Sequence, residues 1–176
     1  MTTWWLTSKK MANKIVIFGN SGSGKSTHAR ELEREGGLCY LDLDTLAWQK
    51  DAPTSRRPIA DSLRDLESFM TANDAWVIEG CYSSLLGAAI RQCSQLLFLN
   101  PGADQCVENC RARSWEPHKY ESPEEQDKNL QMLIDWVRSY ESRADEFSLQ
   151  AHRQLYDSFD GVKIEYDSNT RDANAN

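Results

Sequence analysis

The chain has 176 residues and a net charge of −7, and it contains no hydrophobic run near the roughly 20 residues that span a bilayer. This length is typical of one domain with a sizeable core. The acidic balance offers no basic surface for nucleic acid, so a small-molecule ligand is expected rather than nucleic acid or a membrane. Five cysteines without a CxxC pair favour reduced, mostly buried thiols over disulfides or a zinc site. We therefore expect a cytoplasmic protein.

The first strong pattern joins a short apolar run to a glycine-rich turn. KIVIF, residues 14–18, predicts a buried strand, and HARELERE, residues 28–35, predicts a helix. Between them stands GNSGSGKST, residues 19–27, which has the spacing of a phosphate-binding P-loop. Its glycines let backbone N–H groups turn toward phosphates, and the N-terminus of the following helix favours anions.

This motif predicts a nucleotide site in which each polar residue has a task. Lys25 is expected to reach the β and γ phosphates and to act in catalysis, and the Ser26 hydroxyl is expected to coordinate Mg²⁺. The alternative, a turn with a chance lysine, requires glycine spacing, the Lys-Ser pair and the strand–helix context to coincide. The residues expected to bind the nucleotide are Gly19, Asn20, Ser21, Gly22, Ser23, Gly24, Lys25, Ser26 and Thr27.

Strands and helices then alternate along the chain. Further strands are predicted within 37–44, 75–80, 95–101 and 161–167, with helices between them. This βαβ order predicts an α/β fold with a mostly parallel, doubly wound sheet, whose ligands collect at the carboxyl ends of the strands. The predicted organisation is an N-terminal extension (1–12, in which Met11 can be the natural start), a single domain (13–167) and a disordered tail (168–176).

A more helical region follows the fourth predicted strand. WEPHKYESPEEQ, residues 115–126, is polar and broken by prolines, which is typical of a lid loop. A helix is expected to restart at Ser122, because the order Ser-Pro-Glu-Glu combines an N-cap, a proline in the first turn and a capping box. Its apolar stripe is formed by Leu130, Leu133, Ile134 and Val137.

GNSGSGKST, followed by LDLDTLAW, WVIEGCY and late arginines, resembles the small P-loop kinases. That group includes adenylate-kinase-type nucleotide kinases, shikimate and gluconate kinases, and the FlaR-like or DNA topology modulation proteins. The resemblance extends over residues 13–167 and implies a P-loop NTPase three-layer sandwich, a five-stranded parallel sheet in the order 2-3-1-4-5, and a helical lid over about 111–143. It also implies phosphoryl transfer from ATP, with Mg²⁺, to a small-molecule acceptor.

Three acids stand at predicted strand ends. If the second strand continues through Asp42 and Asp44, its alternation puts both carboxylates on one face. The resemblance to shikimate kinases then implies that Asp42 contacts the Mg²⁺ shell and that Asp44 holds the acceptor hydroxyl. The alternative is two solvated aspartates, one of which caps a helix. Glu79 is expected to act in catalysis, at the metal or the acceptor, although the glycine triplet of shikimate kinases is absent here.

Arginines supply the remaining positive charge. The resemblance implies that Arg111 and Arg113, which border the lid, clamp the transferring phosphoryl group, with Arg138 and Arg143 on the returning helix as a second pair. The pair at 56–57 either binds an anionic acceptor or leads into a helix.

Aromatic and histidine residues are less informative. Trp48, Tyr82 and Trp115 either wall the acceptor site or pack beneath a flap, and His28 and His152 are expected on helix surfaces. Two other functions compete with a kinase. An ATPase would activate water, and a regulatory module would bind nucleotide without an acceptor. The sequence predicts neither the acceptor nor the oligomeric state, and ATP rather than GTP follows from the resemblance alone.

Overall fold

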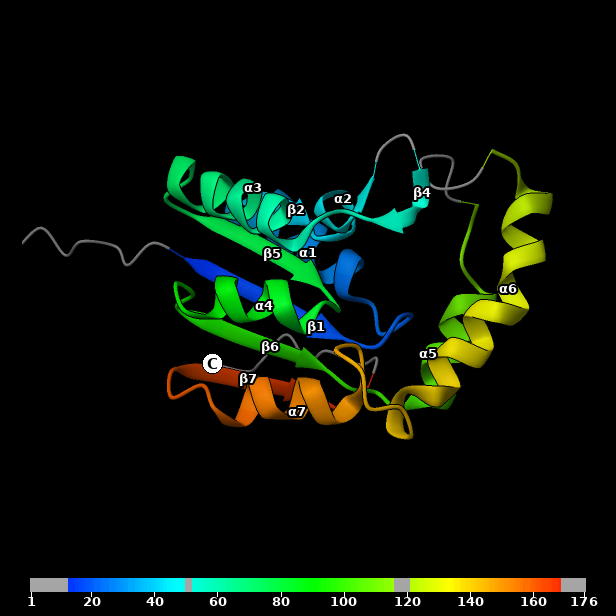
Figure 1. The fold of residues 1–176 in the computed structure, drawn as a ribbon. Helices are drawn as coiled ribbons and strands as arrows, with labels where there is room; N and C mark the ends of the chain where they lie inside the picture. Colours follow the sequence, from blue (N-terminus) through cyan, green and yellow to red (C-terminus); the bar gives the residue numbers. More distant parts are fainter. Residues whose placement is uncertain (1–12, 50–51, 116–120, 169–176) are drawn as a thin grey trace, which may run out of the picture.

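A computed structural model describes residues 13–49, 52–115 and 121–168 (Figure 1). The predicted N-terminal extension, most of the predicted tail and part of the predicted lid loop therefore lie outside the described residues. The elements in chain order are β1 (Lys14–Gly19), α1 (Lys25–Gly36), β2 (Cys39–Asp42), α2 (Asp44–Ala47), β3 (Trp48–Gln49), β4 (Ala52–Arg56), α3 (Ile59–Ala72), β5 (Trp76–Gly80), α4 (Ser83–Ile90), β6 (Gln95–Leu99), α5 (Ala103–Arg111), α6 (Pro123–Arg138), the 3-10 helix η1 (Ser139–Glu141), α7 (Leu149–Asp157) and β7 (Val162–Tyr166).

The main sheet has five parallel strands in the order β2-β5-β1-β6-β7. Counted along this sheet, the order is 2-3-1-4-5, so the predicted fold class and strand order are confirmed. The central strands are nearly continuous apolar runs, as expected where both faces of a parallel sheet are covered. Because Ile17 pairs with Glu79 and Gly19 pairs with Leu99, the carboxyl ends of β5, β1 and β6 meet at one edge.

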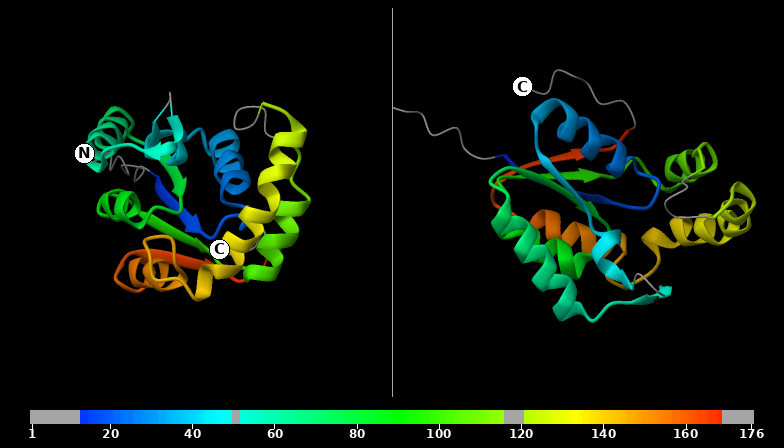
Figure 2. Two further views of the ribbon diagram at one scale, coloured as in Figure 1. Left: turned by 45° about the vertical axis from the view of Figure 1, so that its right-hand side comes forward. Right: turned by 90° about the horizontal axis from the view of Figure 1, so that it is seen from above.

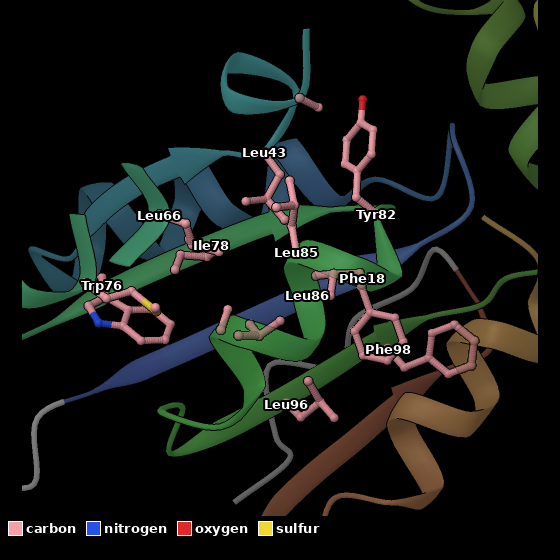
Figure 3. Close-up of a cluster of buried hydrophobic side chains, with 14 residues drawn as sticks. Phe18, Leu43, Leu66, Trp76, Ile78, Tyr82, Leu85, Leu86, Leu96 and Phe98 are labelled. Atoms are coloured by element: carbon pink, nitrogen blue, oxygen red, sulfur yellow. The ribbon is translucent and has the colours of Figure 1, made fainter. Parts of the chain in front are cut away.

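Helices cover both faces of this sheet and make three layers (Figure 2). On one face, α1 packs over a cluster that includes Ile15, Ile17 and Val77. On the other face, α3, α4 and α7 pack over the larger cluster, in which Phe18 stacks on Phe98 (Figure 3). Alternation along β1 explains the division, because odd and even residues point to opposite faces.

Helices α5 and α6 stand side by side beyond the carboxyl ends of the strands (Figure 1). They share a third cluster, and the predicted stripe of α6 lies against it. The predicted cap is confirmed: Ser122 Oγ accepts from the Glu125 N–H at 3.2 Å, and the Glu125 carboxylate accepts from the Glu121 N–H at 2.8 Å. Within the described residues, no helix has both the length and the apolar character to cross a membrane.

The sequence did not predict the hairpin of β3 and β4 or the short helix α2. The expectation that the second strand continues through Asp44 is wrong. Strand β2 ends at Asp42, whereas Asp44 begins α2, so the two carboxylates do not share a strand face. The chain turns there because Asp42 Oδ1 accepts the Asp44 N–H at 2.8 Å and the Leu43 N–H donates to Glu79 O at 2.9 Å. Gly80 leaves room for this turn, since a Cβ on it would lie 2.8 Å from the Leu43 Cβ.

The two histidines predicted on helix surfaces are not there. The side chain of His28 is only 15% exposed and lies against Tyr166. His152 is completely buried, because α7 packs this position onto Phe18 and Phe98 of the sheet. The cysteines were predicted to be mostly buried, and they divide into Cys106 and Cys110, which are buried, Cys81 and Cys93, which are partly buried, and Cys39, which is exposed.

The contacts of His152 fix its proton. Nε2 lies 2.9 Å from Cys81 O, which can only accept, so Nε2 carries the hydrogen. Nδ1 then accepts from the Tyr140 hydroxyl at 2.7 Å. Burial, followed by the charges of Lys25 and Arg143, lowers the pKa of His152 from its ordinary value of 6.5 to about 4. The neutral ring therefore joins α7, η1 and the end of β5.

We expect this neutral ring to make stability depend on pH between about 6.5 and 4. The lowered pKa favours the neutral form, so its stabilisation is complete above pH 6.5 and is lost as the pH falls toward 4, by about 3 kcal/mol. Urea unfolding at pH 7 and pH 4 measures the loss, and His152→Gln should remove most of it. An equal loss of stability in both proteins would assign the pH dependence to other groups.

Candidate active site

The P-loop curls at the edge of the sheet where β1 ends. Gly22 has φ 79°, and a Cβ on it would lie 2.3 Å from Cys106 O on α5. Gly19 is equally constrained, because its Cβ would lie 2.1 Å from Leu99 O on β6. Only glycine fits such close backbone approaches. The motif residues therefore form the predicted strand–turn–helix, with Thr27 exposed on the first turn of α1.

Two polar groups in this loop suit an incoming phosphate. Lys25 is 8% exposed, and its Nζ donates to Asn20 O at 2.7 Å, so the ammonium lies across the loop. The Ser23 hydroxyl is buried and has no hydrogen-bond partner. A buried polar atom without a partner is costly, and a phosphate oxygen would satisfy it. The loop thus fits the nucleotide that the motif implies.

Side-chain amides tie the loop to α5 and α6, which we call the lid helices after the predicted lid. Asn20 Nδ2 donates to Val137 O on α6 at 2.9 Å, while its Oδ1 accepts from the Ser21 N–H at 2.8 Å. Asn109 Nδ2, on α5, donates to Gly22 O at 2.7 Å. Both polar atoms of the Asn20 side chain are therefore already hydrogen-bonded. The predicted contact of Asn20 with nucleotide would have to be made by its backbone.

A buried carboxylate lies beside the predicted metal ligand of the P-loop. Glu79 is 2% exposed, and its Oε1 accepts from the Ser26 hydroxyl at 2.7 Å and from the Tyr40 hydroxyl at 3.0 Å. Burial and then the charge of Glu79 raise the pKa of Tyr40, so Tyr40 remains a donor. Ser26 and Glu79 supply oxygen atoms of the kind that Mg²⁺ binds. Asp42 lies opposite Glu79 on β2 and directs Oδ1 to a backbone N–H instead.

The predicted acceptor residue Asp44 ends a chain of hydrogen bonds. The Trp48 indole N–H donates to the Tyr82 oxygen at 2.7 Å, and the Tyr82 hydroxyl donates to Asp44 Oδ1 at 2.7 Å. Burial and then Asp44 raise the pKa of Tyr82, which keeps the phenol protonated. Trp48 and Tyr82 thus hold the carboxylate of Asp44 and are not simply packing residues.

The arginine pair at the end of β4 is matched with carboxylates. Arg56 Nη2 donates to Glu146 Oε1 at 3.2 Å, and Arg57 Nη2 donates to Asp65 Oδ2 at 2.6 Å. Glu146 follows the lid helices and also accepts from the Ser84 N–H at 3.1 Å. The Arg56 guanidinium lies 4.6 to 5.6 Å from the centres of three aromatic rings, those of Trp48, Tyr82 and Phe147.

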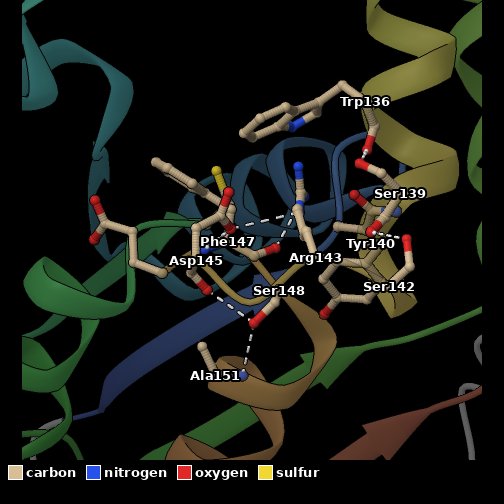
Figure 4. A network of polar contacts seen from close by, with 12 residues as sticks. Trp136, Ser139, Tyr140, Ser142, Arg143, Asp145, Phe147, Ser148 and Ala151 are labelled. Carbon is tan, nitrogen blue, oxygen red and sulfur yellow. Dashed lines mark hydrogen bonds and ion pairs between the residues drawn. The ribbon is translucent and has the colours of Figure 1, made fainter.

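Among the predicted arginines, Arg143 has the most restricted surroundings (Figure 4). Its guanidinium carbon lies 3.7 Å from the ring centre of Trp136, and its Nη2 donates to Phe147 O at 2.9 Å. Nε lies 3.6 Å from Asp145 Oδ1, and neither Nε nor Nη1 has a hydrogen-bond partner although both are buried. Burial lowers the pKa of Arg143.

The other predicted arginines lie at helix ends. Arg111 is the last residue of α5 and is exposed, Arg113 follows it and is partly buried, and Arg138 is exposed at the end of α6.

Hydrogen bonds bring three of the predicted catalytic residues to the end of β5. Glu79 accepts from the hydroxyl of Ser26, which follows Lys25, and its backbone oxygen accepts from the N–H of Leu43, which precedes Asp44. Arg143 reaches the same region through Phe147, whose backbone oxygen accepts from Arg143 Nη2 and whose ring centre lies 5.3 Å from that of Tyr82. The roles of all these residues, and those of Arg111 and Arg113, stay predictions.

Sequence reasoning missed four residues of this region. Tyr40 could have been found, since it stands two residues before Asp42 on a strand that alternates. Glu146 and Phe147 carry no local signal, because only the return of the chain after α6 brings them to β4 and α4. Trp136 on α6 carries none either, because its partners Phe147 and Arg143 come from that same return. Trp115, in contrast, is 44% exposed.

No protein-family model matches the chain, and no curated protein sequence matches it. Solved structures do match. A sugar kinase from Janibacter sp. HTCC2649 is similar with a TM-score of 0.51 and 18% identity, over 88% of this chain and 84% of that one. A gluconokinase from Sinorhizobium meliloti 1021 has a TM-score of 0.49 and 15% identity, over 88% and 83%. At such identities the likeness shows the fold alone, and the resemblance to the FlaR-like group stays a prediction.

The position of Glu79 leads to a prediction about metal dependence. We expect Glu79→Gln to raise the Mg²⁺ concentration needed for half-maximal ATP turnover by about 10–100-fold, because a carboxylate beside Ser26 becomes neutral. Tyr40→Phe removes one donor to that carboxylate and should have a smaller effect. Asp42→Asn, which the sequence predicts to raise the same requirement, is the comparison. A larger effect of Asp42→Asn would assign the Mg²⁺ site to Asp42, at the end of β2, instead of Glu79.

Proposed function

We propose that the protein is an ATP-dependent phosphotransferase that moves the γ-phosphate of ATP to a hydroxyl or phosphate group of a small molecule. The observation that carries this proposal is a set of contacts at the end of β5: Ser26 of the P-loop donates to Glu79, Tyr82 donates to Asp44, and Arg143 donates to Phe147 O. The fold, which the protein shares with a solved sugar kinase, is consistent with it. Phosphoryl transfer needs mainly positioned reactants and stabilised charge, which such a set supplies.

The nucleotide side of the reaction is assigned to the P-loop and β5. Lys25 would exchange its bond to Asn20 O for the β and γ phosphates, and Ser23 would donate its unpartnered hydroxyl. Ser26 and Glu79 would hold Mg²⁺, which, when bound with ATP, neutralises charge on the phosphate oxygens. Glu79 would thereby serve the metal rather than activate water, which separates a kinase from an ATPase.

The acceptor side is assigned to Asp44. With Oδ1 fixed by Tyr82, the carboxylate would orient the acceptor group and take its proton. Arg143 would act between the two sides, because its buried Nε and Nη1 atoms suit the developing charge of a transferring phosphoryl group. Arg111 and Arg113 would contribute through movement of the lid, since they lie at the end of α5.

We expect Asp44→Asn to lower phosphate transfer by about 10²–10⁴, the range of a positioned acid–base group, with little change in ATP affinity. Asparagine keeps the size and can still accept from Tyr82, so the loss would reflect charge. Lys25→Ala should abolish productive use of MgATP. A mass-spectrometric screen of a metabolite library with MgATP identifies the acceptor, and steady-state rates with that acceptor then measure the effects.

A matched control is Asp61→Asn, an exposed aspartate on α3 that pairs with Arg64. Transfer at the parent rate in Asp44→Asn would remove Asp44 from catalysis. ATP turnover that no acceptor stimulates would favour an ATPase, and tight nucleotide binding without turnover would favour a regulatory module.

We expect Arg143→Ala to lower kcat by about 10³ while ATP binding changes little, because the guanidinium would act mainly in the transition state. Arg143→Lys keeps the charge but not the planar fork, and it should restore only part of the rate. Arg64→Ala, on the exposed face of α3, is the control, with circular dichroism to check folding. Arg111→Ala and Arg113→Ala test the sequence prediction in the same assay. Losses confined to these two variants would assign the clamp on the transferring phosphoryl group to Arg111 and Arg113 instead of Arg143.

A further inference from the structure

Among the described residues, the arginine pair on the acceptor side is already neutralised. Arg56 and Arg57, the pair that could recognise an anionic acceptor, each donate to a carboxylate: Glu146 at 3.2 Å and Asp65 at 2.6 Å. Arg57 Nη1 additionally donates to Leu46 O at 3.4 Å. A guanidinium that is already paired offers an incoming anion little net attraction, because the carboxylate beside it repels that anion.

Glu146 is fixed where it neutralises Arg56. Its Oε2 accepts from both the N–H and the hydroxyl of Ser84, at 3.1 and 2.5 Å. Its own backbone oxygen accepts from Ser83, so the residue is held at the start of α4. Anionic groups are favourable at a helix N-terminus, which further stabilises the carboxylate there. Displacement of Glu146 by an anionic acceptor would break all of these contacts.

Asp44 lies close to the pair formed by Arg56 and Glu146. Tyr82 joins Arg56 to Asp44, because its ring lies 4.6 Å from the guanidinium and its hydroxyl donates to Asp44 Oδ1. An anion bound near Asp44 would therefore face the carboxylates of Asp44 and Glu146. Arg143 lies on Trp136 and donates to Phe147 O, and we have assigned it to the transferring phosphate.

We infer that the acceptor is an uncharged polyhydroxylated molecule, a sugar or polyol, one hydroxyl of which lies on Asp44. This inference rests on the proposed function and narrows its acceptor. Hydroxyl groups donate to carboxylates and accept from guanidinium edges, so they match Asp44, Glu146 and Arg56 without adding charge. Discrimination arises because a negatively charged analogue introduces repulsion that a neutral one avoids.

The test compares neutral and anionic compounds of matched shape. The pairs are D-glucose with D-glucuronate, ribitol with D-ribonate, and glycerol with D-glycerate; adenosine with its 5′-monophosphate adds a nucleoside pair. Transfer from MgATP gives kcat/KM, and tryptophan fluorescence titration of the MgADP-loaded protein gives Kd without turnover. We expect a neutral sugar or polyol to be favoured over its anionic partner by roughly tenfold or more in both measurements.

Glu146→Gln tests the cause of that preference. Glutamine keeps the size and an acceptor for Ser84 but removes the charge opposite Arg56, so the preference for neutral compounds should fall by roughly tenfold. Glu35→Gln, which removes the charge opposite the exposed Arg34 at the end of α1, is the matched control and should leave the preference unchanged. Thermal unfolding checks that both variants fold.

The outcomes separate this inference from the proposed function. An anionic partner favoured by the parent protein would overturn the inference while the phosphotransferase stands. Neutral compounds that bind preferentially without being phosphorylated would support the inference and overturn the proposed function. Preference for adenosine over every sugar and polyol would overturn the assignment to polyhydroxylated compounds. An unchanged preference in Glu146→Gln would show that Arg56 and Glu146 do not set it.

Discussion

Two side-chain amides, those of Asn20 and Asn109, make the P-loop and the lid helices one assembly. The glycines of the loop have no side chains with which to anchor it, so its shape depends on Asn20 and on the residues that surround it. The bonds to Val137 and Gly22 supply that support and fix where α6 ends. From that point the chain turns through η1 and carries Arg143 back to the sheet edge. The positions of the phosphate-binding and acceptor-side residues are thus mutually dependent.

Burial determines the ionisation of the groups around β5. Tyr40 and Tyr82 lie beside carboxylates in a poorly solvated region, so their pKa values rise and both phenols stay donors. His152 stays neutral for the same reason. Tyr40 and Tyr82, which stay protonated near neutral pH, therefore donate hydrogen bonds to the carboxylates of Glu79 and Asp44.

The sequence predicted the fold and the P-loop because both follow from patterns within short stretches of the sequence. Buried parallel strands are short apolar runs, and phosphate binding requires glycines and a lysine at fixed spacing. The region from Asp44 to Arg56 could not be predicted in this way, since α2 and the hairpin depend on Asp42 binding the turn and on Arg56 packing against Phe147. The surroundings of Arg143 could not be predicted either, since Trp136 and Phe147, which enclose its guanidinium, are brought together only by the turn after α6.

The hydrogen bonds from Trp48 through Tyr82 to Asp44 run in one direction only. An indole N–H can donate but cannot accept, so the Tyr82 oxygen receives that hydrogen and gives its own to Asp44. Tyr82 and Trp48 consequently offer no route by which a proton could travel back from Asp44. If Asp44 takes the proton of the acceptor, as we propose, that proton has to leave by a path that does not pass through these two side chains.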